Sequence, residues 1–161
     1  MPHFASDIQI ASATAEHLDA ICNIENTCFL TPWTKDAVQS EISDIGWSRT
    51  IVALRESQVL GYCLYWLVAD EIQLLKVAVH PQYQRKGVGG SMLQHIIHDG
   101  LSKKIHSITL ELRASNPAAR RLYEKLNFQV TGIRRGYYTD TGDDALLMDF
   151  TFPSAPEKTD S

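Results

Sequence analysis

The chain has 161 residues, 44% of them hydrophobic and 21% charged, which is typical of one globular domain around one core. Its 19 acidic and 15 basic residues give a net charge of −4, which argues against general nucleic-acid binding because that affinity comes from neutralising phosphates. The apolar runs are too short to span a membrane, and the start, MPHFASDIQI, carries no secretory signal, so we expect a cytoplasmic protein without membrane or nucleic-acid partners.

The cysteines and histidines give no indication of a metal site. Cys22, Cys28 and Cys63 form neither a C-x-x-C motif nor a zinc-ligand spacing, so we expect reduced thiols that pack as small hydrophobic side chains. His95 and His98 lie three positions apart on a predicted helix, but no third ligand has a suitable spacing. We therefore expect no metal.

The first half of the chain is predicted to contain two helices followed by three strands. Apolar residues at helical spacing predict a helix over Thr14–Cys28 and, after a proline-containing break, another over Thr34–Ile42. Runs rich in β-formers predict strands at Arg49–Leu54, Gln58–Val68 and Glu71–Val79.

The second half alternates helices and strands. The pattern predicts helices at Val88–Asp99 and Asn116–Leu126, and strands at Ser107–Leu112, Gln129–Arg134 and Ala145–Phe152. This order favours an α/β (α+β) sheet with helices packed on it. We expect one domain over residues 1–150 and a flexible polar tail over 151–161.

A glycine-rich segment, QRKGVGG, joins the third strand to the next helix. Gly87, Gly89 and Gly90 permit positive φ angles and a close approach of the backbone to a ligand. A helix N-terminus together with Arg85 and Lys86 would favour a phosphate. The segment fits neither G-x-x-x-x-G-K-[ST] nor G-x-G-x-x-G. By itself it is equally compatible with phosphate binding and with an ordinary strand-to-helix turn.

Two longer stretches are more specific. VAVHPQYQRKGVGG followed by ELRASNPAARRLYEKLNF resembles the GNAT superfamily of acetyl-CoA-dependent N-acetyltransferases, in which Q/R-x-x-G-x-G/A binds the pyrophosphate. FLTPWT, DEIQLLKVAV and IRRGYYTDTGDDALLM extend the similarity to the RimI-type ribosomal-protein-alanine N-acetyltransferases. Together these stretches cover most of residues 15–150. Lys76 and Gly90 depart from that pattern, because similar sequences often carry Asn at the first position and Arg or Ala at the second.

The resemblance implies a GNAT fold, in which a twisted, mixed and mostly antiparallel sheet is splayed at its centre and flanked by about four helices. Acetyl-CoA would lie in the opening, and the acceptor amine would enter from the other side. It implies that the residues in contact with the cofactor are Val77, Ala78, Val79, Arg85, Lys86, Gly87, Val88, Gly89, Gly90, Asn116 and Tyr123.

The resemblance assigns Glu111 as the general base, and the sequence allows that role. Leu110 and Leu112 share one face of the predicted strand, so Glu111 is presented on the other face. A carboxylate with an ordinary pKa near ~4.3 is a weak base unless burial raises its pKa or a water relays the proton. The alternative is an ion pair of Glu111 with Arg113 or Lys103 on a solvated face.

The resemblance assigns Tyr123 as the general acid. A phenol with a pKa of roughly 10 can donate a proton to a departing thiolate whose conjugate acid has a pKa of roughly 8.5, with a small uphill step. The alternative is that Tyr123 only packs on the sheet, as Leu122 and Leu126 do.

The acceptor is the least determined part of the prediction. The resemblance places Trp33, Arg134 and Tyr138 beside the acceptor peptide, although they could simply cover the edge of the core. It implies acetylation of the N-terminal alanine of a small-subunit ribosomal protein. A protein lysine or a small-molecule amine as the acceptor remains open, as does a non-catalytic acetyl-CoA-binding module.

Overall fold

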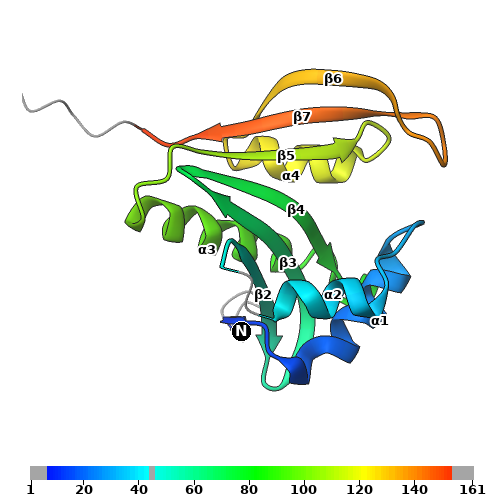
Figure 1. The fold of residues 1–161 in the computed structure, drawn as a ribbon, viewed down its shortest axis with the longest axis vertical. Coiled ribbons are helices and arrows are strands. Elements are labelled where there is room, and N and C mark those ends of the chain that lie inside the picture. Colours follow the sequence, from blue (N-terminus) through cyan, green and yellow to red (C-terminus); the bar gives the residue numbers. More distant parts are fainter. Residues whose placement is uncertain (1–6, 44–45, 154–161) are drawn as a thin grey trace, which may run out of the picture.

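A computed structural model of the chain describes residues 7–43 and 46–153. Within them, one seven-stranded sheet has the order β1-β2-β3-β4-β5-β7-β6 (Figure 1). The strands are β1 (Gln9–Ser12), β2 (Ser48–Arg55), β3 (Gln58–Val68), β4 (Glu71–Val79), β5 (Ser107–Arg113), β6 (Gln129–Tyr138) and β7 (Asp143–Thr151). The helices are α1 (Leu18–Cys28), α2 (Lys35–Ile42), α3 (Val88–Ser102) and α4 (Pro117–Lys125), with short 3₁₀ turns η2 (Ala15–His17) and η3 (Pro81–Tyr83).

The predicted mixed architecture is confirmed, and each predicted helix and strand is present. Two strands, Gln58–Val68 and Glu71–Val79, have the predicted bounds, and the other elements differ by a few residues at one or both ends. The sequence prediction missed one element, β1, whose four residues pair antiparallel with Ile51–Leu54 of β2. Most of the expected tail lies outside the described residues. Phe152 is buried at 5% exposure against Gly100 of α3, so close packing continues through that residue.

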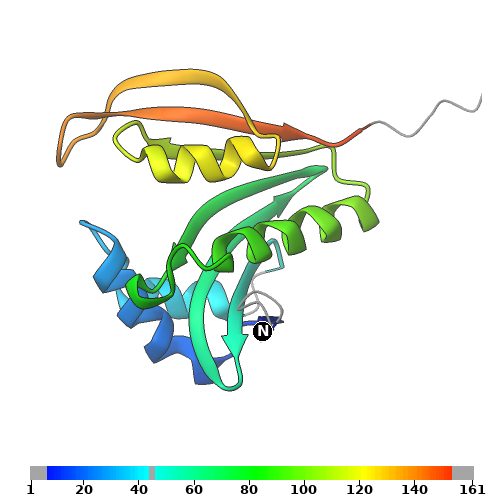
Figure 2. The same ribbon diagram turned by 180° about the vertical axis from the view of Figure 1, so that it is seen from behind.

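Helices cover both faces of the sheet. Figures 1 and 2, which view the molecule from opposite sides, show α1 and α2 on one face and α3 and α4 on the other. Each face has its own apolar core: Ile21 and Ile24 of α1 pack with Tyr62 on the first face, and Met92 and Ile96 of α3 belong to the cluster on the second. No helix within residues 7–43 and 46–153 is both long and apolar enough to span a membrane.

The sheet opens between its fourth and fifth strands. β4 and β5 are parallel neighbours, but they pair only where Glu71–Leu74 faces Ser107–Leu110. Leu75 is the extra residue of a bulge, because Leu64 of β3 faces Lys76 and Tyr65 faces Leu74. A bulge bends and twists a strand. From Leu75 onward β4 therefore follows β3 away from β5, as the diverging ribbons in Figure 1 show.

The glycine-rich segment forms the turn into α3, and its residues differ in conformation. Only Gly87 among the three glycines has a positive φ, 85°, and Arg85 also adopts the left-handed region with φ 63°. Gly89 and Gly90 lie inside α3, where a Cβ on Gly89 would come within 3.3 Å of the Leu122 side chain. Gly87 therefore makes the turn, and Gly89 lets α3 approach α4 closely.

Candidate active site

A cavity of about 780 Å³ occupies the opening between β4 and β5. Four segments form its wall: the end of α1 with the loop that follows, the second half of β4, β5 with α4, and the turn between β6 and β7. Its wall contains side chains from both faces of the sheet, with Leu110, Leu112 and Tyr123 on one face and Glu111 on the other. It brings together Glu111, Tyr123, Val77, Asn116 and Tyr138, all predicted to act at the site.

Glu111 lies on the face of β5 opposite to the buried Leu110 and Leu112, as their alternation predicts. Its side chain is 34% exposed and lines the cavity. The carboxylate lies 3.7 Å from the guanidinium of Arg134 on β6. Arg134 is therefore the ion-pair partner, in place of the Arg113 and Lys103 considered from sequence.

Tyr123 lines the same cavity from α4, on the opposite face of the sheet. It is 8% exposed, and its ring packs edge-on against Phe128 with centroids 5.5 Å apart. Burial raises the pKa of Tyr123 above its ordinary value. The phenol is therefore a neutral hydrogen-bond donor and a weaker acid than a solvated tyrosine, which makes full proton transfer to a thiolate more uphill than the sequence argument assumed.

Asn116 caps the helix that carries Tyr123. Its side-chain oxygen accepts a hydrogen bond from the Ala119 amide at 3.1 Å, and Pro117 occupies the first helical position. Both features stabilise a helix start. Asn116 also lines the cavity, so the cap fixes the start of α4 at the wall of the site.

The predicted cofactor-binding segment divides into two parts. Val77 lines the cavity, while Ala78 is buried against α1 and Val79 packs on the α3 side. The segment Arg85–Gly90 lies outside the cavity wall, at the start of α3. Gly87 is the N-cap of this helix, and it has no side chain that could accept a hydrogen bond from the first amides. The first amides of a helix have no intrahelical acceptor, so this helix start can bind an anion.

The three predicted acceptor residues do not converge. Tyr138 lines the cavity, and burial, followed by the nearby charge of Glu111, raises the pKa of its phenol. Trp33 and Arg134 are absent from the cavity wall. The Trp33 indole instead packs against the Lys76 ammonium, 4.6 Å from the ring centre, and Arg134 reaches the site through Glu111.

A buried carboxylate, Glu25, holds the loop after α1 against β4 and was missed from sequence. Its side chain is 1% exposed and receives hydrogen bonds from the Lys76 ammonium at 2.5 Å, the Trp33 amide at 2.7 Å and the Tyr62 hydroxyl. The Lys76 ammonium also lies 4.3 Å from the Phe29 ring centre. Burial lowers the pKa of Lys76, and Glu25 opposes that shift. A Glu at a core-facing position of α1, four residues after Ile21, was the available signal.

Asp140, also missed from sequence, lies in the turn between β6 and β7. Arg113 lowers the pKa of its carboxyl group through a paired hydrogen bond. Across the described part of the chain, no three His, Cys, Asp or Glu side chains are grouped to hold a metal ion.

The opening between parallel β4 and β5 leaves the second half of β4 without a neighbour on one edge, beside a helix start suited to phosphate. This architecture defines the class of acetyltransferases that bind their acyl donor within a splayed sheet. The chain belongs to the acetyltransferase (GNAT) family, whose family model matches residues 18–128.

Individual relatives agree with that assignment and with the predicted resemblance. The chain is 33% identical over 141 residues to the ribosomal protein bS18-alanine N-acetyltransferase of Escherichia coli (strain K12), covering 86% of this chain and 94% of that protein. The crystal structure of the Escherichia coli ribosomal-protein-S18-alanine N-acetyltransferase superimposes with a TM-score of 0.86 and 32% identity over 94% of this chain and 97% of that one. Arabidopsis thaliana NAA60 in complex with acetyl-CoA, at 14% identity, shares the fold with a TM-score of 0.82 over 90% and 98% of the two chains.

Proposed function

We propose that this chain transfers the acetyl group of acetyl-CoA to the α-amine of the N-terminal alanine of ribosomal protein bS18. The observation that carries the proposal is the meeting of Glu111 and Tyr123, from opposite faces of the sheet, in one cavity at the β4–β5 opening. The assignment of bS18 as the acceptor is supported by the relatives, which are named as ribosomal protein bS18-alanine or S18-alanine N-acetyltransferases.

The residues present fit acetyl-CoA. The amides of Val88 and its neighbours at the start of α3, together with Arg85 and Lys86, would receive the pyrophosphate. The edge of β4 at Val77–Val79 would pair with the amide-containing arm of the cofactor as an added strand does. When bound, acetyl-CoA supplies the acetyl group and a thiolate leaving group.

Glu111 would accept the proton of the acceptor amine. An α-amine has a pKa of roughly 7.7–8.0, so much of it is protonated near pH 7 and must lose a proton before it can attack. The Glu111 carboxylate reaches the cavity from the acceptor side, and its partial exposure allows a water to relay the proton.

Tyr123 would stabilise the departing sulfur. Burial raises the pKa of the phenol, so it is protonated at neutral pH and can donate a hydrogen bond to negative charge as that charge develops. Such a donor acts mainly on the rate of acyl transfer and little on cofactor affinity.

Acceptor binding would involve Tyr138 directly. Its ring lies on the cavity wall, where it can contact the first residues of a peptide. Arg134 would act by holding Glu111, and Trp33 by fixing the loop between α1 and α2.

Mass spectrometry of ribosomal proteins tests the proposal. Unacetylated small-subunit proteins are incubated with the enzyme and acetyl-CoA, and we expect one acetyl group on the N-terminal alanine of bS18. A bS18 peptide with a blocked α-amine serves as the control and should remain unmodified. Acetylation confined to lysine side chains would contradict the acceptor assignment. Calorimetric binding of coenzyme A without turnover on any amine would contradict catalysis itself.

A further inference from the structure

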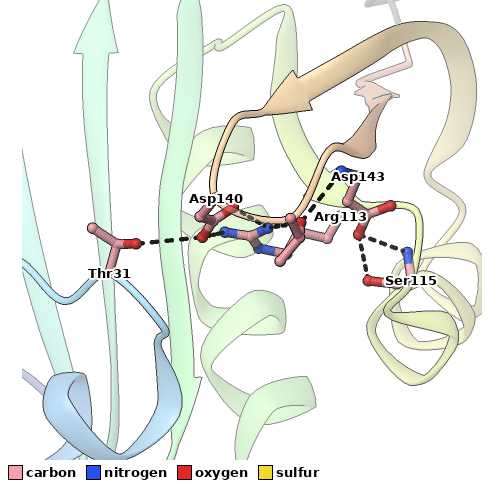
Figure 3. Close-up of polar contacts among 6 residues, drawn as sticks. Thr31, Arg113, Ser115, Asp140 and Asp143 are labelled. Atoms are coloured by element: carbon pink, nitrogen blue, oxygen red, sulfur yellow. Dashed lines mark hydrogen bonds and ion pairs between the residues drawn. The ribbon is translucent and has the colours of Figure 1, made fainter.

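A chain of polar contacts joins the two loops at the acceptor end of the cavity (Figure 3). Arg113, the last residue of β5, donates two hydrogen bonds to Asp140, at 3.0 Å to one carboxylate oxygen and 2.7 Å to the other. Thr31, in the loop between α1 and α2, donates to the same carboxylate at 3.3 Å. Asp140 thus connects segments 109 residues apart in the chain.

A second contact fixes the other end of the same turn. Asp143 accepts hydrogen bonds from the amide of Ser115, at 3.3 Å, and from the Ser115 hydroxyl (Figure 3). Ser115 directly precedes Asn116, the cap of α4. The turn between β6 and β7 is therefore attached both to the strand that carries Glu111 and to the start of the helix that carries Tyr123.

The geometry distinguishes this ion pair from an ordinary surface pair. Isolated exposed pairs contribute little, but a bidentate Arg–carboxylate pair within a network is the exception. The Arg113 guanidinium also stacks on the Tyr138 ring, 4.0 Å from its centre, and donates to the Thr141 hydroxyl at 3.1 Å. The side chains of Arg113 and Asp140 are 27% and 31% exposed. One guanidinium thus fixes both the ring and the carboxylate.

We propose that Arg113 and Asp140 are positioning residues for the acceptor, a role that builds on the proposed function and deepens it. Arg113 holds the Tyr138 ring on the cavity wall, and Asp140 ties that turn to Thr31 on the opposite loop. The two loops then form one wall in a fixed position relative to Glu111, which precedes Arg113 by two residues on the same strand face. An acceptor binds this wall without having to order it first.

Steady-state kinetics with a bS18 N-terminal peptide tests the role. Asp140→Ala should raise the KM for the peptide about 10-fold or more, leave kcat within about 3-fold, and leave coenzyme A affinity within about 2-fold, because the loops lie away from the helix start that receives the pyrophosphate. Arg113→Lys should behave like Asp140→Ala, since lysine provides neither the paired hydrogen bonds nor the planar stack.

Conservative variants separate positioning from general loss of structure. Thr31→Val should raise the peptide KM several-fold, whereas Thr31→Ser, which keeps the hydroxyl, should restore it. Arg120→Ala removes an Arg–carboxylate pair on the exposed side of α4 and serves as the matched control with an unchanged KM. Equal peptide KM values in wild type, Asp140→Ala and Arg113→Lys would overturn the proposal, as would a loss confined to kcat.

Hydrogen exchange gives a readout independent of activity. In Asp140→Ala, amides of both 28–33 and 138–143 should exchange faster, and faster exchange in only one of the two segments would refute the link. If the wild type acetylates a lysine or a small amine but no peptide α-amine, the proposed function has failed. In that case, the KM values of wild type, Asp140→Ala and Arg113→Lys for the lysine or amine acceptor test the positioning role independently of the proposed function.

Discussion

We expect a large loss in the free energy of unfolding when one charge of the buried ion pair between Glu25 and Lys76 is removed. Lys76→Met would leave the Glu25 carboxylate, 1% exposed, with hydrogen bonds from Tyr62 and the Trp33 amide but without a counter-charge. A buried charge without its partner is costly, because neither water nor an opposite charge replaces the lost interaction. The expected loss therefore comes from a buried charge without a partner, not from a lost surface contact.

The expected magnitude follows from the burial of the two groups. Breaking a buried ion pair by removing one partner costs about 3–5 kcal/mol. We expect the lower end, about 3 kcal/mol, because two hydrogen bonds to Glu25 persist and the Lys76 side chain is 10% exposed. For a chain of this size, that loss lowers Tm by roughly 6–12 °C.

Chemical and thermal unfolding followed by circular dichroism measure this loss. Lys35→Met is the matched control, because Lys35 pairs with Asp19 at 3.1 Å but the two side chains are 61% and 88% exposed. We expect that control to lose much less stability than Lys76→Met, because water solvates both charges of an exposed pair. The double variant Glu25→Gln/Lys76→Met removes both charges. It should lose less stability than the two single variants lose together, and we expect this difference, the coupling energy, to be about 1–3 kcal/mol.

Two results would refute the reasoning. One is a loss in Lys76→Met no larger than in Lys35→Met, and the other is strict additivity in the double variant. Either result would mean that the Glu25 side chain does not depend on the Lys76 ammonium for its stability in the fold. Because Glu25 also holds the Trp33 amide, we further expect Lys76→Met to loosen the loop that follows α1.

Three other predictions concern the reaction and the pH dependence of stability. Tyr123→Phe should lower kcat about 100-fold and change the KM for acetyl-CoA less than about 3-fold; equal effects on both would show a binding role. Glu111→Gln should flatten the acidic limb of the pH–rate profile, and an unchanged limb would place the base elsewhere. Burial raises the pKa of Tyr65 to about 12, so its contribution to stability is complete below pH ~10, its ordinary value, and is lost as pH rises from there through about 12. Tyr65→Phe should therefore reduce the fall in unfolding free energy between about pH 10 and 12, measured by denaturant titration. An identical fall in both proteins would count against a buried, neutral Tyr65.

Local pattern was sufficient for most elements of the fold. The strands Gln58–Val68 and Glu71–Val79 were predicted with the observed bounds, because long runs of β-branched and aromatic residues end at turn residues. The predicted starts of α2 and α4, Thr34 and Asn116, are the observed capping residues, and the side chain of each accepts an amide hydrogen bond. Strand β1 was missed because four residues are too few for a period, and its pairing with β2 is a tertiary contact.

Only some of the residues at the candidate active site could be predicted from the sequence. Glu111 and Tyr123 could be proposed because the stretches around them resemble a known family, although pattern alone favoured packing or ion-pair roles. Gly89 was predicted to contact the cofactor, and the structure adds a packing role, because Gly89 faces Leu122 of α4 in a helix interface that the sequence did not indicate. Glu25 and Asp140 were missed because their partners are contributed by other elements.

By itself, the sequence determined the helices, most strands, the mixed architecture and the family, since each depends on the order and spacing of neighbouring residues. Tertiary structure alone decided where the sheet opens, that Glu25 is buried with Lys76, and that Thr31, Arg113 and Asp140 meet at the mouth of the cavity. The reason is physical: burial and pairing of a charge depend on groups brought from distant segments, and local periodicity carries no information about which distant segments become neighbours.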